Sequence, residues 1–255
     1  MRNTMPVDFP PGGPDLMKRS PSVPIVNLRL PVNTQGVDWI CSDLHGQFPV
    51  LKEMLKEVEF NDQTDRLILL GDIIDRGPSS LETLSWVLSA PFCFSVMGNH
   101  ELLFWVSTYH PELIEKHLRL GGEWSSSLSL TQRHRLVQGI LSSFPLTLTL
   151  ELSMGDIGIV HSQSPFDDWG DIESSEFSEA LAKRCTWEWA RSYQNTKALV
   201  RGVLAVVSGH IGSNHVLQNG NQLWIDTIEK TGKPTLLSVT QILQQYMPPL
   251  TRLSR

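Results

Sequence analysis

The amino-acid sequence predicts an α/β fold with two stacked β-sheets and helices on the outside. Residues 37–107 alternate short apolar runs with segments of helical spacing, in the order β-α-β-α-β-α. That order is typical of a sheet with helices packed on its faces. Residues 145–240 contain five more strand-like runs, which are enough for a second sheet. About 40% of the residues are hydrophobic, so the chain can bury a sizeable core.

The first half of the chain contains strands and helices in alternation. Apolar runs that end in polar residues or glycine predict strands at residues 37–43, 65–72 and 92–99. Apolar side chains at helical spacing predict helices at residues 47–58 and 79–90, and residues 100–107 begin a third helix.

The second half is richer in strands. A helical stretch over residues 111–143 comes first. Residues 145–152 then alternate apolar and polar side chains, which predicts a half-buried strand. Further strand-like runs follow at residues 156–162, 202–210, 221–227 and 235–240.

Composition changes at both ends suggest three segments. Residues 1–35 begin with a proline-rich stretch and are expected to form an extended N-terminal arm. Residues 36–246 are expected to form one catalytic domain, and residues 247–255 a C-terminal tail.

Charge and cysteine content exclude several classes of protein. The formal net charge of −6 argues against a dedicated nucleic-acid binder, which normally has a basic face. Cys41, Cys93 and Cys185 are too few for a disulfide framework and predict free thiols in a reducing compartment. We find no apolar run long enough to span a membrane and no signal-peptide pattern. A cytoplasmic protein without a membrane partner is expected.

Polar residues recur where the predicted strands end. They are Asp43 and His45, then Asp72 with Asp75 and Arg76, then Asn99, His100 and Glu101, and finally His161 and His210. In α/β sheets the crevice beyond the carboxyl ends of the strands binds ligands. Carboxylate, amide and imidazole ligands suit Mn, Fe or Zn. Six such ligands exceed what one ion normally takes from a protein, so two metals sharing a carboxylate are predicted.

Three blocks also carry a family resemblance. "SDLHGQ" (42–47), "GDIIDRG" (71–77) and "GNHE" (98–101) resemble the signature blocks of the PPP-type calcineurin-like metallophosphatases. The chain is most similar to the small bacterial and phage serine/threonine protein phosphatases of the lambda phosphatase type. Shorter matches follow at "GGEW" (121–124), "VHS" (160–162), "WAR" (189–191) and "SGH" (208–210), so the resemblance covers about residues 36–240.

The resemblance implies a four-layer αββα sandwich, with two mixed sheets flanked by helices, and a role for each site residue. Asp43 and His45 would hold the first metal, and Asp72 would bridge both metals. The second metal would be held by Asn99, His161 and His210.

The remaining site residues would act on the substrate. Arg76, Asn99 and Arg191 would bind its phosphate. Asp75 would hydrogen-bond to His100 and keep it protonated.

The implied reaction is the hydrolysis of phosphoserine and phosphothreonine in phosphoproteins or phosphopeptides, with phosphotyrosine as a further candidate. Two divalent ions, with Mn expected and Fe or Zn as alternatives, would lower the pKa of a bridging water. The resulting hydroxide would attack phosphorus in line. His100 would protonate the leaving oxygen as the general acid.

Two other functions fit parts of the pattern. Symmetric dinucleoside polyphosphate hydrolases resemble the same blocks, but they usually lack the Asp before Arg-Gly and read Gly-Asn-His-Asp. Asp75 and Glu101 therefore favour the protein phosphatase. A non-catalytic binding module would normally lack a ligand or the acid, and none is missing here.

Several residues outside the blocks have their own expectations. "WIDTIEKTGKP" (224–234) departs from the glycine-rich stretch of the family, so the substrate rim is expected to differ. His110, His117 and His134 lie on polar helical stretches and are expected to be solvated. The acidic stretch over residues 166–179 is interpreted as a solvated loop rather than a guide for basic peptides.

Overall fold

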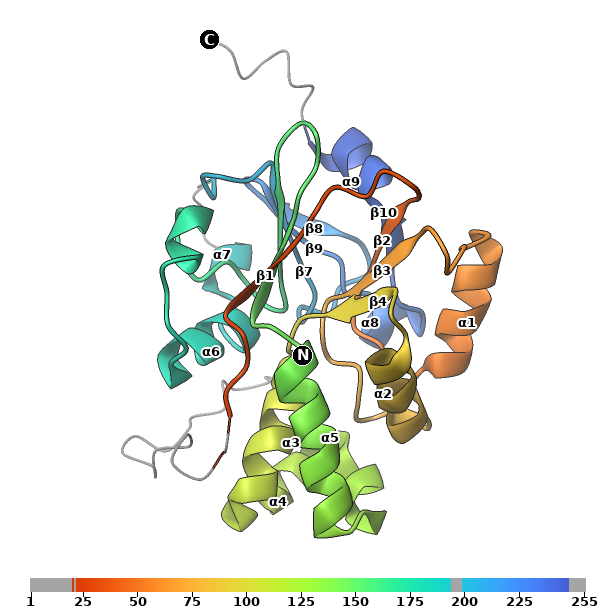
Figure 1. Ribbon diagram of the computed structural model, residues 1–255, viewed down its shortest axis with the longest axis vertical. Helices are drawn as coiled ribbons and strands as arrows, with labels where there is room; N and C mark the ends of the chain where they lie inside the picture. The colour runs from red at the N-terminus through yellow and green to blue at the C-terminus, as the bar shows by residue number, and fades with distance from the viewer. Residues whose placement is uncertain (1–19, 21, 194–198, 248–255) are drawn as a thin grey trace.

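The computed structural model describes residues 20, 22–193 and 199–247, and its strands form two mixed sheets (Figure 1). The larger sheet has the order β1 (Asn27–Leu30), β5 (Thr147–Leu150), β6 (Ile157–Val160), β7 (Ala205–Ser208), β9 (Gln222–Trp224) and β8 (Leu217–Asn219). The smaller sheet has the order β10 (Leu236–Ser238), β2 (Asp38–Cys41), β3 (Arg66–Leu69) and β4 (Cys93–Ser95).

Helices follow or connect these strands. They are α1 (Phe48–Glu57), α2 (Ser80–Ser89), α3 (Asn99–Tyr109), α4 (Ile114–His117), α5 (Leu130–Ser143), α6 (Glu179–Thr186), α7 (Ala190–Tyr193), α8 (Ile228–Thr231) and α9 (Val239–Tyr246). Short 3₁₀ segments at Pro111–Leu113, Glu123–Ser127 and Trp169–Ile172, and a π turn at Leu118–Gly122, complete the described elements. Helices α3, α4 and α5 lie together at one end of the molecule (Figure 1).

The two sheets pack face to face over one apolar core. Ile40 and Ile68 of the smaller sheet meet Leu148, Ile159 and Val207 of the larger sheet in this layer, and all five are fully buried. The opposite face of each sheet is covered by helices. Leu51 of α1 and Leu84 of α2 pack with the smaller sheet, and Leu181 of α6 packs with the larger one. This arrangement confirms the predicted α/β sandwich.

Strand direction brings the ends of the sheets to one place. Strands β2, β3 and β4 are parallel, and so are β6, β7 and β9. The carboxyl ends of the parallel strands in a sheet lie at the same edge, and ligands bind in the crevice beyond them. The loops that leave β2, β3, β4, β6 and β7 carry the polar residues that the sequence singled out.

Residues 27–30 of the expected N-terminal arm form β1, which pairs in parallel with β5. Residues 1–19 of that arm and residues 248–255 of the predicted tail lie outside the described residues. Strand β5 is not half-buried as expected, because all four of its residues are buried. The alternating Thr147 and Thr149 face the covered side and bond to the side chain of Asn27 instead of water.

The acidic stretch over residues 166–179 is also not a plain solvated loop. Trp169 and Ile172 are buried, and the Trp169 indole donates a hydrogen bond to Thr149. The carboxylates of Asp167, Asp168 and Glu173 pair with Arg191, Arg201 and Arg29. Part of the negative charge of the stretch is therefore neutralised locally.

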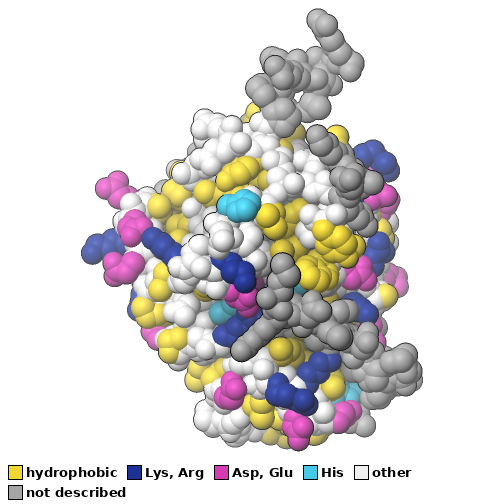
Figure 2. All heavy atoms as spheres, turned by 180° about the vertical axis from the view of Figure 1, so that it is seen from behind, with side chains coloured by type: hydrophobic (Ala, Val, Ile, Leu, Met, Phe, Trp, Pro, Cys, Tyr) yellow, Lys and Arg dark blue, Asp and Glu magenta, His cyan; other side chains and the backbone are white. Residues whose placement is uncertain are grey.

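The surface is chemically mixed. Basic, acidic and histidine side chains meet near the middle of the face shown in Figure 2, with hydrophobic side chains nearby. Among the described helices, none combines the length and apolar character needed to cross a membrane. The three cysteines are buried and unpaired, as predicted.

Candidate active site

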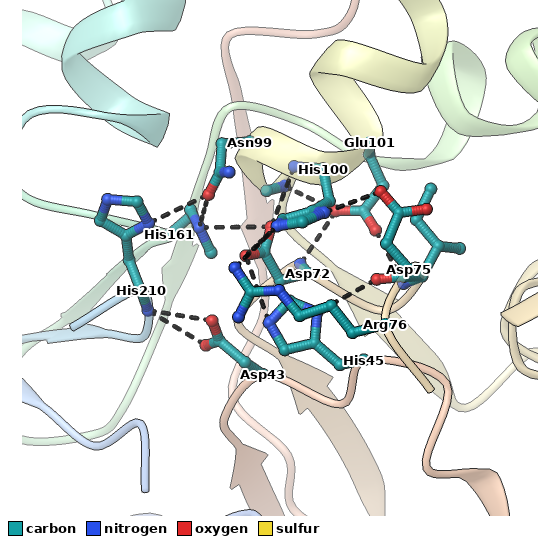
Figure 3. Close-up of polar contacts among 12 residues, drawn as sticks. Asp43, His45, Asp72, Asp75, Arg76, Asn99, His100, Glu101, His161 and His210 are labelled. Carbon is teal, nitrogen blue, oxygen red and sulfur yellow. Dashed lines mark hydrogen bonds and ion pairs between the residues drawn. The ribbon is translucent and has the colours of Figure 1, made fainter. Parts of the chain in front are cut away.

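The predicted site residues other than Arg191 converge at the carboxyl ends of the strands (Figure 3). Asp43 and His45 follow β2, and Asp72, Asp75 and Arg76 follow β3. Helix α3 begins with Asn99, His100 and Glu101, and the loops after β6 and β7 supply His161 and His210. Five separate segments of chain thus contribute to one cluster.

The backbone of the cluster is strained. Among the described residues, six that are not glycine have a positive φ, and five of them belong to the cluster: His45, Asp72, Asp75, Arg76 and His210. Such conformations cost of order 1–3 kcal/mol each and persist only where the surrounding structure enforces them. Their concentration here indicates that the fold gives up stability to aim these side chains.

Two glycines allow the chain to approach the carboxylates closely. A Cβ at Gly98 would lie 2.2 Å from Asp72 Oδ1, and a Cβ at Gly209 would lie 2.0 Å from Asp43 Oδ1. No side chain fits at those distances. This is the physical reason for glycine beside Asn99 and His210 in the motifs.

The histidines of the cluster are held by backbone groups on their outer side. His45 Nδ1 lies 3.1 Å from the Ile74 carbonyl, and His161 Nδ1 lies 2.7 Å from the Leu70 carbonyl. Because a carbonyl only accepts, each Nδ1 carries the proton, and each Nε2 presents a lone pair to the cluster. His210 likewise has a backbone hydrogen bond to Trp187. Outer hydrogen bonds of this kind orient histidines that ligate metals.

Three atoms that can only accept hydrogen bonds then lie close together: Asn99 Oδ1, His161 Nε2 and His210 Nδ1. Asn99 Oδ1 lies 2.9 Å from His161 Nε2 and 3.0 Å from His210 Nδ1. Metal–ligand bonds of about 2.0–2.2 Å place neighbouring ligand atoms about 3 Å apart at octahedral angles. The donor set and its spacing therefore fit a divalent cation.

Asp72 belongs to two potential metal-binding groups of the described residues. One group is Asp72, His161 and His210, and the other is His45, Asp72 and His100. Asp72 Oδ1 lies 3.4 Å from His161 Nε2, while Oδ2 lies 3.8 Å from both His45 Nε2 and His100 Nε2. The position suits a bridging carboxylate.

The group around His45 differs from the expected pair, because it contains His100 and not Asp43. The Asp43 carboxylate accepts hydrogen bonds from the His210 backbone N–H at 3.1 and 3.2 Å.

The electrostatics of the cluster also call for positive charge. Burial raises the pKa of Asp43 well above its usual range, and the nearby carboxylates of Asp226 and Asp72 raise it further. Burial lowers the pKa of both His45 and His210 to about 3, so these imidazoles are neutral. Buried carboxylates beside neutral imidazoles are a ligand set that suits divalent cations.

His100 and Asp75 form the predicted pair. His100 Nδ1 lies 2.7 Å from Asp75 Oδ2, and both side chains are buried. On the other side, Arg76 Nη2 lies 3.2 Å from His100 Nε2. Because a guanidinium only donates, Nε2 accepts from Arg76 here and Nδ1 donates to Asp75.

Two further donors hold Asp75, and the sequence did not reveal the first. His117, predicted to be solvated, is fully buried, and its Nε2 lies 3.1 Å from both carboxylate oxygens of Asp75. Trp124 of the "GGEW" block donates from Nε1 to Asp75 Oδ1 at 2.6 Å. Burial alone raises the pKa of Asp75, but the N–H groups of His100 and His117 outweigh it and hold that pKa well below its usual range.

The expectation for the other two histidines also fails in part. His110 is fully buried, while His134 is partly exposed and stacks on Tyr109.

We expect the His117→Asn variant to lose stability, because it leaves the buried Asp75 carboxylate without one donor. The free energy of unfolding should fall by about 1–3 kcal/mol, the usual cost of an unsatisfied buried group. Urea denaturation would measure it. His134→Asn is the matched control and should change stability by less than about 0.5 kcal/mol. Equal effects of both substitutions would contradict the role of the His117 hydrogen bond.

Glu101 has a structural role that its motif did not specify. Its carboxylate accepts backbone N–H groups of Asp72, Ile73, Ile74 and Gly98 at 2.8–3.2 Å. One buried side chain thus ties the loop after β3 to the start of α3, which fixes Asp72 relative to Asn99.

Arg191 lies on α7 and is not brought into contact with the other site residues by any described hydrogen bond. Its guanidinium donates to the Ser164 carbonyl at 3.0 Å and pairs with Asp167. Its backbone N–H donates to Gln163, two residues after His161, at 2.8 Å. The residue is therefore near the His161 loop, but its guanidinium is paired with the Asp167 carboxylate.

A family model and a curated relative both match this chain as a phosphatase-type protein. A model of the calcineurin-like phosphoesterase family matches residues 39–226. Serine/threonine-protein phosphatase 2 of Salmonella typhimurium is 29% identical over 196 residues, which cover 74% of this chain and 86% of the relative.

Relatives with a second kind of name also match. A symmetrical bis(5'-nucleosyl)-tetraphosphatase of Erwinia tasmaniensis is 43% identical over 65 residues, which cover 25% of this chain and 24% of that protein. A solved structure provisionally named a diadenosine tetraphosphatase shares the fold, with a TM-score of 0.57 and 18% identity over 84% of this chain and 97% of that chain.

Proposed function

The chain belongs to the calcineurin-like phosphoesterase family, and on that premise we propose that it is a dinuclear-metal phosphatase acting on phosphoserine and phosphothreonine in proteins. The resemblance to PPP-type phosphatases is confirmed by this match and by relatives named serine/threonine-protein phosphatase. The substrate proposal rests on one observation, the 2.7 Å hydrogen bond between Asp75 and His100. An alkoxide is a poor leaving group, so its departure requires a positioned proton donor.

The six ligand-type residues are proposed to hold two divalent ions, with Mn²⁺ as the proposed metal. We assign Asp43 and His45 to one ion, Asp72 to both, and Asn99, His161 and His210 to the other. When bound, such ions supply Lewis acidity at the phosphoryl oxygens and lower the pKa of water. The outer hydrogen bonds of the histidines support this assignment, because they leave lone pairs directed into the cluster.

The phosphate is proposed to be bound by Arg76, with Arg191 and the Asn99 amide as further contacts. A planar guanidinium matches two phosphate oxygens at once. Arg76 lies beside His100, so a phosphate that it binds is next to the acid. Arg191 has to leave Asp167 to reach the phosphate.

The proton step follows from the contacts of His100. In the structure, Nε2 accepts from Arg76. When a phosphate binds the Arg76 guanidinium, His100 Nε2 no longer accepts from Arg76 and can carry a proton. His100 Nδ1 keeps its hydrogen bond to Asp75. His100 can then protonate the leaving oxygen, and Asp75 stabilises the imidazolium that gives up the proton.

Symmetric dinucleoside polyphosphate hydrolysis is the second candidate function. It is favoured by the 43% identity over 65 residues to a relative with that name. A polyphosphate has a better leaving group than an alkoxide, so it depends less on an acid held as firmly as His100.

The decisive experiment compares kcat/KM for a phosphothreonine peptide with that for diadenosine tetraphosphate, at the same metal concentration and pH. We expect the peptide to be preferred by at least about tenfold, or about 1.4 kcal/mol in transition-state binding. A tenfold preference for the dinucleotide would reverse the order of the two candidates.

A further inference from the structure

We propose that Glu229 is a specificity-determining residue that disfavours substrates with additional negative charge beside the scissile phosphate. The inference rests on the proposed role of Arg76 in phosphate binding and deepens it. Arg76 Nη2 contacts His100, whereas Nη1 forms an ion pair with the Glu229 carboxylate. The guanidinium proposed to bind phosphate is therefore shared with an anion of the protein itself.

Glu229 is held in place by its short helix. It lies on α8, which begins immediately after the buried pair Asp226 and Thr227. The Ile228 backbone N–H donates to Asp226 Oδ1 at 3.0 Å, and the Ile228 side chain is buried. Thr227 Oγ1 donates to the Lys233 carbonyl at 2.9 Å, which closes the loop. These contacts fix the backbone from which the Glu229 side chain extends.

The same carboxylate lies beside the His210 loop. A Cβ at Gly212 would lie 3.4 Å from Glu229 Oε2 and 3.7 Å from Asp226 Oδ2. Gly212 comes two residues after His210. Glu229 therefore spans from the His210 loop to Arg76, along the rim of the site, and it does so within the stretch where the sequence departs from the family pattern.

The negative charge of Glu229 determines which anionic substrates can bind at this rim. A terminal phosphoryl group can compete with Glu229 for Arg76, because both ligands are anionic and the guanidinium has five donors. A second phosphate or a flanking acidic side chain would meet the carboxylate directly. Juxtaposed like charges are a common way for binding sites to reject a competing ligand.

Breaking the ion pair between Arg76 and Glu229 costs a phosphomonoester little free energy. The Arg76 side chain is 35% exposed and the Glu229 side chain 48%, and exposed pairs contribute little to stability. A monoester can therefore displace Glu229 from Arg76, while the carboxylate stays close enough to repel further anions.

The test is Glu229→Gln, which removes the charge and keeps the shape. An aryl phosphate serves as the substrate with one phosphate, and diadenosine tetraphosphate as the one with several. We expect the ratio of kcat/KM for the dinucleotide to that for the aryl phosphate to rise about tenfold in the variant. A phosphothreonine peptide flanked by aspartates should gain similarly over the same peptide flanked by alanines.

Binding gives a second readout that does not require turnover. Inorganic phosphate and tripolyphosphate are tested as competitive inhibitors of aryl phosphate hydrolysis. In Glu229→Gln the inhibition constant for tripolyphosphate should fall about tenfold further than that for phosphate.

The matched control is Glu173→Gln. Glu173 is 49% exposed, pairs with Arg29 and lies in another part of the fold. It should leave every ratio unchanged.

Two outcomes would overturn the proposal. An equal loss of kcat/KM for all substrates would mean that Glu229 only positions Arg76. Unchanged ratios would mean that the carboxylate does not reach the substrate. Failure of the proposed function is a separate result. It would appear as a preference of the wild-type protein for diadenosine tetraphosphate over the phosphothreonine peptide. The test of Glu229 instead compares the kcat/KM ratio of the dinucleotide to the aryl phosphate before and after the substitution.

Discussion

Replacing Asp72 with asparagine is expected to lower activity by more than about 100-fold and to reduce the metal content below two ions per chain. Loss of an outer partner of a metal ligand already costs about 10–100-fold in affinity or activity, and Asp72 is shared by both potential metal-binding groups. The Asn amide keeps the shape but removes the charge and one acceptor. Elemental analysis of the purified variant and hydrolysis of an aryl phosphate would measure the two effects.

Asp38→Asn is the control for that substitution. Asp38 is also a buried carboxylate, and it pairs with Arg66 at 2.6 Å, but it lies at the start of β2, away from the carboxyl end of the strand. It should lower stability and leave the metal content at the wild-type value. If Asp72→Asn retained two ions and wild-type activity, the proposed bridging role would be wrong.

The ligand-type residues could be predicted from the sequence because of a simple rule of topology. Each of Asp43, Asp72, Asn99, His161 and His210 closely succeeds an apolar run. Parallel strands direct the residues after them to one edge of the sheet, so residues far apart in the chain meet there. Contacts such as His210 Nδ1 to Asn99 Oδ1 result from that rule, although the two residues are 111 positions apart.

The residues behind and above this cluster could not be predicted in that way. His117 lies in a helical stretch whose neighbours are charged, and no periodicity distinguishes it from a solvated histidine. It is buried because α4 packs against α3 and directs it at Asp75, 42 residues away. No sequence pattern identifies Glu229 either, since its partner Arg76 is 153 residues away. A side chain whose only signal is a distant partner requires the three-dimensional fold.

The His100→Asn variant tests the proposed acid. A positioned general acid contributes about 10²–10⁴-fold, so kcat for a phosphothreonine peptide should fall by that factor. Burial lowers the pKa of His100, but the Asp72 and Asp75 carboxylates outweigh it and raise that pKa. The imidazole is thus suited to carrying a proton, whereas the asparagine amide cannot donate one to an alkoxide. Metal content should stay at the wild-type value if His100 is not a ligand.

The dependence on the leaving group separates an acid from a structural residue. An aryl phosphate whose phenol is very acidic leaves without protonation, so its kcat should fall far less in His100→Asn than that of the peptide. His134→Asn, which changes a partly exposed histidine on α5, should leave both substrates unaffected. An equal loss for both substrates together with a loss of metal would show that His100 is a ligand, as its 3.8 Å distance to Asp72 allows. An equal loss with full metal content would show that it only shapes the site, and the Asp75 hydrogen bond would then no longer support phosphomonoesters over polyphosphates.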